Sequence, residues 1–269
     1  MSTTSERPTL LTGWEAGVDD GDTLCRAWLH HWADVCASVA AAARGTVVRD
    51  ERFCFADHGR PAAFFNSVVL LAPPADWSAL LDEIEHLASW GTGELHLWSI
   101  WPTPDLHPRG WVLDGHPPLL VRPPATAVPV AAPDPAPEPV RDPAALARWE
   151  RVLVEGYPLP DVLPLRPGRL FDPALLGNPR WRFFTSGPSA DPVAVSAQFV
   201  SRGLAGFAIG VTRPQARRGG HWWRHALTRI RHEPDLWQAG VFSDASRPGA
   251  EAIGFVPVLR HTLWHRDRE

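Results

Sequence analysis

A proline-rich segment near the middle of the chain places the strongest constraint on its fold. Seven of the 17 residues from 123 to 139 are proline. Proline lacks a backbone N–H and fixes φ, so this segment can form neither a helix nor a central strand. Such composition favours an extended linker. We therefore expect an N-terminal domain at residues 1–122, a linker at 123–140 and a C-terminal domain at 141–269.

The charge differs strongly between the two sides of this segment. Residues 1–139 contain 8 Arg and 18 Asp or Glu, whereas residues 140–269 contain 18 Arg and 12 Asp or Glu. The net charges are therefore −10 and +6, which the overall value of −4 conceals. A basic C-terminal half can attract a phosphate-rich ligand, although solvated arginines are the more common explanation of such a count.

The composition is that of a water-soluble globular protein. The chain has 269 residues, of which 45% are hydrophobic, enough for two small domains or one large domain. No apolar run approaches the length of a membrane span, and residues 1–8 lack the order of a signal peptide. We expect a cytoplasmic protein without membrane association. Three unpaired cysteines argue against a disulfide framework, and we expect no metal site.

In the first half, apolar periodicity predicts alternating helices and strands. Residues 23–44 and a segment capped by Asp76 have helical spacing. Residues 64–71 and 94–101 have the character of strands. Residues 111–121 are expected to form one more strand, bent at 115–118.

The second half gives a clearer order of elements. Asp142 followed by Pro143 is an N-cap signal for a helix that ends near residue 156. Strands are expected at 181–186, 193–200, 204–212, 238–243 and 255–264. A helix is expected at 217–232, and a short helical segment precedes the last strand. This order indicates an α/β protein with an α+β layered arrangement.

Two motifs in this half resemble those of the GNAT superfamily of N-acyltransferases. Residues 211–220 read VTRPQARRGG, similar to the strand, turn and glycine-rich loop that open the donor-binding helix. Residues 252–255 read AIGF, similar to the segment before the final strand. The resemblance covers roughly residues 145–265. It implies a mixed, mostly antiparallel sheet flanked by helices, and acetyl-CoA or another acyl-CoA as donor.

The resemblance also assigns residues to the donor site. The N–H groups at a helix N-terminus suit a pyrophosphate, and glycines allow its close approach. The strand before the loop would hold the acyl carbonyl and the pantetheine arm through its backbone. The expected donor-binding residues are Ile209, Val211, Thr212, Arg217, Arg218, Gly219, Gly220, His221 and Trp222.

The sequence departs from the family pattern at two places. Trp222 replaces a small residue and Arg218 replaces a glycine of the loop. The position of the tyrosine that acts as general acid in members of the family is occupied by Ala250, whereas the only tyrosine of the chain is Tyr157. The indole of Trp222 would fill the pyrophosphate space unless it turns outward.

These departures favour a second donor, aminoacyl-tRNA, as an alternative to an acyl-CoA. A phosphate-binding surface would then include Arg213, Arg224, Arg229 and Arg231. A solvated helix face is the simpler interpretation of the same arginines.

Residues 64–122 resemble, more weakly, the N-terminal half of two-domain actinobacterial GNAT proteins, a second and degenerate copy of the fold. The resemblance implies two GNAT-like domains with an acceptor pocket between them. Asp105 or His116 could accept a proton from an attacking amine. Ser243, at the end of an expected strand, is a third catalytic candidate.

Two functions remain open at this stage. The first is an N-acyltransferase that acts on an amine of a small molecule, in specialised metabolism. The second is a binding protein that kept the GNAT fold and lost catalysis. The chain is expected to be a monomer or a homodimer.

Overall fold

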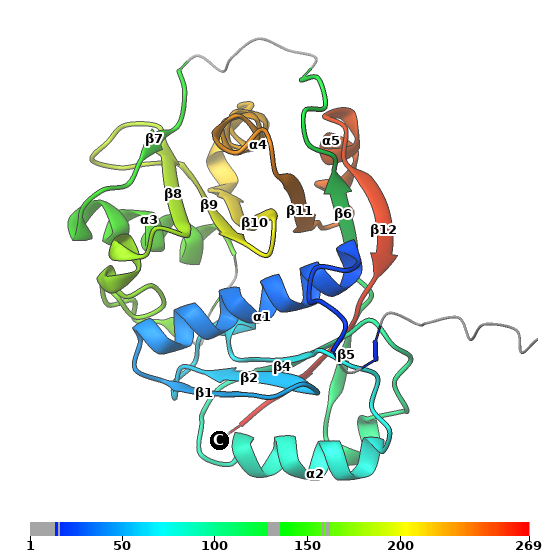
Figure 1. Cartoon of the computed structure of the whole chain (residues 1–269). Helices are drawn as coiled ribbons and strands as arrows, with labels where there is room; N and C mark the ends of the chain where they lie inside the picture. Colours follow the sequence, from blue (N-terminus) through cyan, green and yellow to red (C-terminus); the bar gives the residue numbers. More distant parts are fainter. Residues whose placement is uncertain (1–13, 16, 129–134, 158, 160–161, 269) are drawn as a thin grey trace, which may run out of the picture.

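The computed structural model describes residues 14–15, 17–128, 135–157, 159 and 162–268. Residues 129–134 of the expected linker lie outside this range. The described residues form two β-sheets and five α-helices. The sheets lie one above the other, with one helix passing between them (Figure 1).

The first sheet has six strands in the order β1-β2-β3-β4-β13-β5. Its strands are β1 (Thr46–Arg49), β2 (Phe53–Asp57), β3 (Ser67–Leu70), β4 (Leu95–Ser99), β13 (Thr262–Arg266) and β5 (Val112–Gly115). Only β3 and β4 pair in parallel. Helix α2 (Trp77–Ala88) covers one face, and its first turn is capped by Asp76, which accepts from the N–H groups of Ser78 and Ala79.

The second sheet has seven strands in the order β12-β6-β11-β10-β9-β8-β7. Its strands are β12 (Val256–Arg260), β6 (Pro118–Arg122), β11 (Trp237–Val241), β10 (Leu204–Thr212), β9 (Ala194–Ser201), β8 (Trp181–Ser186) and β7 (Glu138–Pro139). Only β10 and β11 pair in parallel. Both sheets are therefore mixed and mostly antiparallel, which confirms the expected fold class.

The two sheets exchange strands. β6 joins the second sheet between β11 and β12, and β13 joins the first sheet between β4 and β5. The expected single strands at 111–121 and 255–264 are therefore wrong, because each contains two strands that belong to different sheets. The strand structure is interrupted at Pro117 in the first of these segments and at His261 in the second. The sheets consequently do not divide at the proline-rich segment.

Helices complete the layers. Helix α1 (Leu24–Ala42) passes between the sheets and contacts β2 and β3 on one side and β9 and β10 on the other (Figure 1). Helix α3 (Pro143–Gly156) packs on the same face of the second sheet. Helices α4 (His221–His232) and α5 (Arg247–Ala252) cover the opposite face. Helix α4 begins four residues later than expected, since Arg218 and Gly220 have left-handed backbone conformations.

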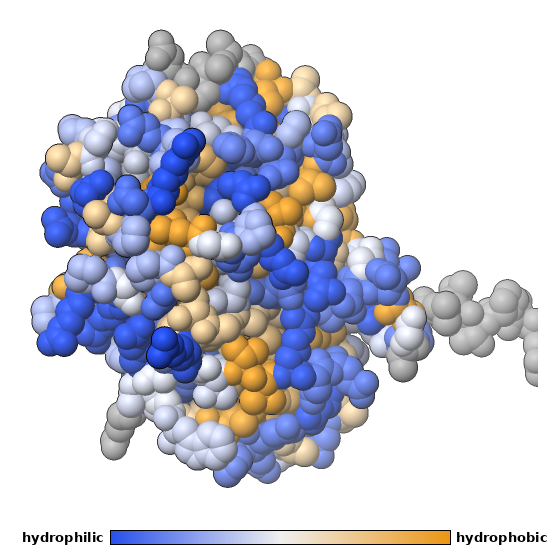
Figure 2. Space-filling view, turned by 60° about the vertical axis from the view of Figure 1, so that its left-hand side comes forward, coloured by the Kyte–Doolittle hydropathy of each residue, from blue (hydrophilic) through white to orange (hydrophobic). Residues whose placement is uncertain are grey.

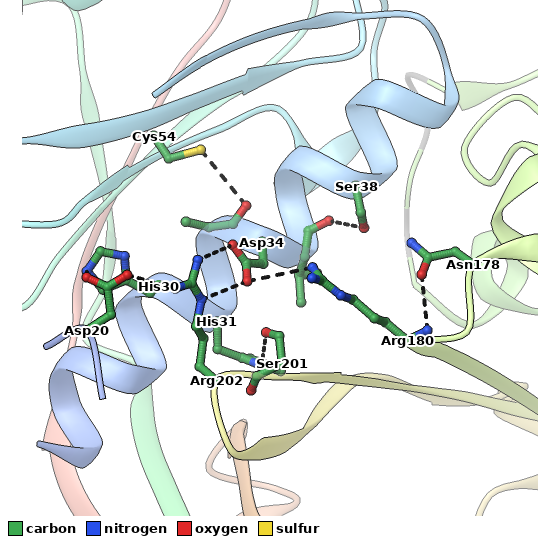
Figure 3. A network of polar contacts seen from close by, with 12 residues as sticks. Asp20, His30, His31, Asp34, Ser38, Cys54, Asn178, Arg180, Ser201 and Arg202 are labelled. Atoms are coloured by element: carbon green, nitrogen blue, oxygen red, sulfur yellow. Dashed lines mark hydrogen bonds and ion pairs between the residues drawn. The ribbon is translucent and has the colours of Figure 1, made fainter. Parts of the chain in front are cut away.

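A buried carboxylate ties α1 to both sheets. Asp34 on α1 is 8% exposed. It accepts a hydrogen bond from Nη1 of Arg49 on β1 at 2.6 Å. It accepts another from Nε of Arg202 beyond β9 at 3.0 Å (Figure 3). Burial alone would raise the pKa of Asp34, but the bonds from the two arginines hold it below its usual value. The position of α1 is thus fixed by charge as well as by packing.

Apolar side chains that reach the surface lie mostly on edge strands. Five of the eight large exposed ones are Val47, Val112, Leu113, Val256 and Val258, on β1, β5 and β12. Over the face shown in Figure 2, apolar patches alternate with broad hydrophilic areas. Short edge strands with neighbouring charges limit pairing with other chains. None of the described helices is long and apolar enough to cross a membrane.

His261 lies at the joint between β12 and β13, where the chain passes from one sheet to the other. It is 1% exposed, and its Nε2 accepts a hydrogen bond from Nε1 of Trp28 at 3.0 Å. Burial lowers the pKa of His261 to about 4, although a hydrogen bond from its Nδ1 to the backbone carbonyl of Pro117 opposes this shift. The imidazole is therefore neutral at pH 7.

Acidification should weaken the fold through this residue. The folded pKa is below the unfolded value near 6.5, so the unfolded chain binds more protons and stability falls as pH decreases from about 6.5 towards 4. Between pH 7 and 5 this group should account for a loss on the order of 2 kcal/mol. Urea unfolding of the wild type and of His261→Gln, which keeps an acceptor for Trp28, would measure it. If both proteins lost the same free energy of unfolding between pH 7 and 5, protonation of His261 would not be the cause.

Candidate active site

Strands β10 and β11 separate in the middle of the second sheet. They pair in parallel only from Leu204 to Gly206, opposite residues 237–239. The register between β10 and β9 shifts between Gly206 and Ile209, and β10 then continues to Thr212 with β9 alone. Gly206 has no room for a Cβ, because the ring of His31 on α1 lies against its backbone. One side of β10 is therefore open beyond the bulge.

The antiparallel register decides which backbone groups face this opening. The N–H of Arg213 bonds to the carbonyl of Val193 at 2.9 Å, so alternate residues, Val211 and Ile209, also direct their backbone groups to β9. Gly210 and Thr212 direct theirs to the opening. The hydroxyl of Tyr157 donates to the carbonyl of Gly210 at 3.4 Å, in agreement with this pattern. Gly210 was absent from the expected donor residues, whereas Thr212 was included.

A buried cation lies beneath the bulge. Arg229 of α4 is 2% exposed, and its Nη1 donates to the carbonyl of Ile209 at 2.9 Å. Its Cζ lies 3.7 Å from the ring centroid of Phe207. Burial lowers the pKa of Arg229 to about 9, so the guanidinium remains charged at neutral pH. The bulge and the cation occupy the same place in the sheet.

The N-terminus of α4 offers free backbone donors. Gly220, the residue before the helix, has φ of 75° and provides no side-chain cap. Among the described residues, the N–H groups of His221, Trp222 and Trp223 have no acceptor. They border a cleft of about 650 Å³, which we call the loop cleft and which Arg217 and Arg218 also line. Free N–H groups, a helix dipole and two cations suit a pyrophosphate.

Trp222 extends sideways to helix α5. A Cβ on Gly249 of α5 would lie 2.8 Å from the indole, so the glycine makes room for it. The ring is half-buried and packs with Trp223 at a centroid distance of 6.4 Å. The loop cleft remains open beside it, and Trp222 forms part of the cleft wall.

A chain of hydrogen bonds connects His221 to strands β8 and β9. Ser186 on β8 lies 2.9 Å from Nδ1 of His221 and 3.0 Å from Nε2 of His225. Nδ1 of His225 in turn lies 2.7 Å from the hydroxyl of Ser196. Burial, with Arg229 next, lowers the pKa of His225 to about 3. The two histidines are four residues apart, a spacing that could suit a metal ion, but these ring nitrogens are engaged by serines.

A second hollow lies on the other side of the opening, between β10, α1 and the first sheet. This aromatic cavity, bounded by Trp28, Trp98, Tyr157 and Phe207, has a volume of about 520 Å³. Eight of its 18 lining residues are Trp, Phe or Tyr. The residues that line both the cavity and the loop cleft are Tyr157, Gly210, Trp222, Ser243 and Ser246. The two hollows therefore meet beside the open edge of β10.

Tyr157 is a site residue that the sequence motifs did not find. It follows α3 and is 93 residues before Ala250, the position that corresponds to the family's tyrosine. The residue as a whole is 37% exposed, but burial of its hydroxyl end raises the pKa of the hydroxyl, although Arg229 opposes the shift. The phenol is therefore a proton donor at neutral pH. The only sequence signal was that it is the single tyrosine of the chain.

The expected catalytic residues separate into two groups. Ser243 lines both hollows and its hydroxyl lies 3.0 Å from that of Ser246. Asp105 and His116 are exposed and line neither hollow. Asp105 instead pairs with Nδ1 of His107 at 2.6 Å. The histidine that lines the aromatic cavity is His96. Burial lowers the pKa of His96 to about 4, although the negative charge of Asp114 opposes this shift.

The four arginines expected to contact a nucleic acid do not share one surface. Arg213 is buried and pairs with Glu155 at 2.6 Å and Asp191 at 2.7 Å. Arg229 is buried beneath β10, whereas Arg224 and Arg231 are half-buried. Burial therefore removes Arg213 and Arg229 from the expected phosphate-binding surface.

A group of possible metal ligands lies elsewhere, at one end of the first sheet. One ligand atom each from Glu94, His265 and Asp267 falls within 4.8 Å of the others. Nδ1 of His265 lies 2.6 Å from Oδ1 of Asp114. A carboxylate in this position orients metal-ligating histidines in other proteins. Exposed acidic side chains often cluster in this way without binding a metal, so we assign no metal ion to these three residues.

Solved structures of low sequence identity share this architecture. A GCN5-related N-acetyltransferase from Kribbella flavida is 16% identical, with a TM-score of 0.57 over 88% of this chain and 96% of that chain. A protein described as an acetyltransferase of the GNAT family from Novosphingobium aromaticivorans is 14% identical, with a TM-score of 0.57 over 89% and 97%. A conserved protein of unknown function from Staphylococcus epidermidis is 11% identical, with a TM-score of 0.57 over 82% and 93%.

No protein-family model and no curated protein matches the sequence. At identities this low, similarity of structure shows the fold alone. The chain has the fold of the GNAT acetyltransferases, as the two motifs indicated.

Removal of the Ser186 hydroxyl should destabilise the start of helix α4, because this hydroxyl bonds to two histidines of the helix. In Ser186→Ala, His221 and His225 each lose a partner, and the buried imidazole nitrogen of His225 is left unsatisfied at a cost of about 1–3 kcal/mol. Urea unfolding at pH 7 would measure the loss. Ser189→Ala, at an exposed position, is the control and should be neutral. Equal stability of the two variants would show that the chain of hydrogen bonds does not support the helix.

Proposed function

We propose that the protein is an N-acyltransferase that moves an acyl group from an acyl-CoA onto an amine of a small molecule. The observation that carries this proposal is the open edge of β10 at Gly210. There, a cleft suited to phosphates meets an apolar cavity, and the hydroxyl of Tyr157 lies 3.4 Å from the strand. Donor and acceptor can thus approach one point from opposite sides.

The loop cleft supports the donor part of the proposal. The pyrophosphate would bind the N–H groups at the start of α4, with Arg217 and Arg218 as counter-charges. Arg217 is already directed to the cleft, since its Nη2 donates to the carbonyl of Gly156 at 3.1 Å. The arm of the donor would then follow the open edge of β10 through the backbone groups of Thr212 and Gly210.

The residues at the opening suit direct transfer without a covalent enzyme intermediate. The neutral amine attacks the thioester carbonyl, whose oxygen accepts from a backbone N–H such as that of Gly210. The C–S bond then breaks, and the hydroxyl of Tyr157 donates its proton to the leaving thiolate. The proton of the amine passes to water or to the neutral imidazole of His96, and the tyrosine is reprotonated from solvent. The charge of Arg229 favours the negative charge that develops during these steps.

Replacement of the tyrosine hydroxyl tests the chemical step. Tyr157→Phe should lower kcat by about two orders of magnitude, because general acid catalysis is lost. The dissociation constant of the acyl-CoA should not change, since the aromatic ring and its contact with Phe64 remain. Single-turnover assays with acetyl-CoA and calorimetry would separate the two quantities. A wild-type kcat in Tyr157→Phe would remove the tyrosine from the mechanism.

Replacement of a loop arginine tests the donor. Arg218 is exposed at the loop cleft, so Arg218→Ala should weaken acetyl-CoA binding about tenfold. Arg151→Ala, an exposed arginine on α3 away from the loop cleft, is the control and should bind as the wild type does. Equal binding by both variants and the wild type would contradict the proposed pyrophosphate position.

Aminoacyl-tRNA is the second candidate donor, and the burial of Arg213 and Arg229 leaves it with less support. If it is the donor, Arg224→Ala with Arg231→Ala should weaken tRNA binding and flatten its salt dependence. Unchanged affinity would exclude this helix as the contact.

A binding protein without catalysis is the alternative that Trp222 and Ala250 motivate. It predicts no transfer from either donor, together with a gain of acetyl-CoA binding in Trp222→Gly. Loss of a measurable transfer in the same variant would support a specialised donor site instead.

A further inference from the structure

The walls of the aromatic cavity point to the shape of its ligand. Trp28 and Trp32 come from α1, and Trp98 comes from β4 of the first sheet. The rings of Trp32 and Trp98 meet edge to face at a centroid distance of 5.3 Å, and Trp28 stacks with Trp32 at 6.0 Å. At about 520 Å³, the cavity far exceeds the space that an acetyl group needs. Aromatic walls of this kind favour a flat apolar group.

The charges of the cavity limit what else the ligand can carry. Among the lining residues in the described part of the chain, none is Asp or Glu, and Arg229 is a cation at neutral pH. Burial keeps His96 neutral at pH 7. A second ammonium group would lose its hydration beside a guanidinium, with no carboxylate to compensate. Polyamines and other polycationic amines are therefore poor ligands.

The place where the two hollows meet fixes the orientation of the ligand. Ser243, Ser246 and Tyr157 supply the polar groups at this junction, whereas the walls farther from it are apolar except for His96 and Arg229. An amine at the junction would lie next to the open edge of β10 at Gly210. The remainder of the molecule would lie against the indoles of α1 and β4, which line the cavity.

We propose that the aromatic cavity is the acceptor site and that it selects an aromatic monoamine, an aryl group carrying one primary amine and no second cation. This inference rests on the proposed acyl transfer, since it assigns the acceptor of that reaction. The amine enters uncharged, because the cation of Arg229 disfavours an ammonium group.

Binding without a donor tests this selection independently of catalysis. The probes are phenethylamine, n-hexylamine and 1,5-diaminopentane, measured by calorimetry on the full chain. We expect phenethylamine to bind at least about tenfold more tightly than the diamine and more tightly than hexylamine. The affinity for phenethylamine should rise with pH between 7 and 8.5, as more of the amine loses its proton.

A matched pair of variants places the ligand. Phe64 lines the cavity and is half-buried, so Phe64→Leu should weaken phenethylamine binding several-fold without loss of the fold. Trp90 is 70% exposed and lies outside the cavity, so Trp90→Leu should bind as the wild type does. Thermal unfolding of both variants would check that each is folded.

The outcomes distinguish this inference from the proposed function. Selective binding of phenethylamine without transfer from any donor would contradict the acyltransferase and leave the cavity assignment standing. Equal or tighter binding of the diamine, or an unchanged affinity in Phe64→Leu, would overturn the aromatic monoamine. Tighter binding of benzoyl-CoA than of acetyl-CoA, abolished in Phe64→Leu and without any preference among amines, would assign the cavity to the acyl group and also overturn it.

Discussion

The separation of β10 from β11 is the feature on which the rest of the site depends. Two adjacent parallel strands normally share hydrogen bonds along their length, and here the bonding stops after Gly206. Arg229 lies under the bulge and bonds to the carbonyls of Ile209 and Ala197. A buried cation without a carboxylate partner is costly, and these carbonyls and the ring of Phe207 offset part of that cost. The opening therefore contains both free backbone groups and a fixed positive charge.

The sequence predicted those parts of the fold that have local causes. The bounds of β8 and β10 agree with expectation, and so does the start of α3, because alternating apolar residues and the Asp142 cap act within a few residues. The strand exchange could not be predicted in this way. Residues 118–122 and 262–266 have ordinary strand character, and only their pairing with distant strands decides which sheet they join. That pairing depends on how the two halves pack on α1.

The candidate site was predicted only where its residues belong to one continuous motif. The loop from Arg217 to Trp222 was found because the helix N-terminus and its glycines are adjacent in the sequence. Tyr157 was not found, since it reaches Gly210 from another helix and the two are 53 residues apart. Asp105 was selected from a turn motif, and it lies on the surface, paired with a neighbouring histidine. The identity of Gly210 follows from strand register, which a sequence alone does not reveal.

The strand exchange has a consequence for how the chain is made. β13 lies between β4 and β5 in the first sheet, yet residues 262–266 leave the ribosome after every other strand of that sheet. Until then, β4 has an open edge next to a buried core, a surface that can pair with other chains. The first half therefore completes its folding only after synthesis of the second. Slow translation, or truncation before residue 262, should accordingly leave this edge of β4 open to aggregation and to chaperones.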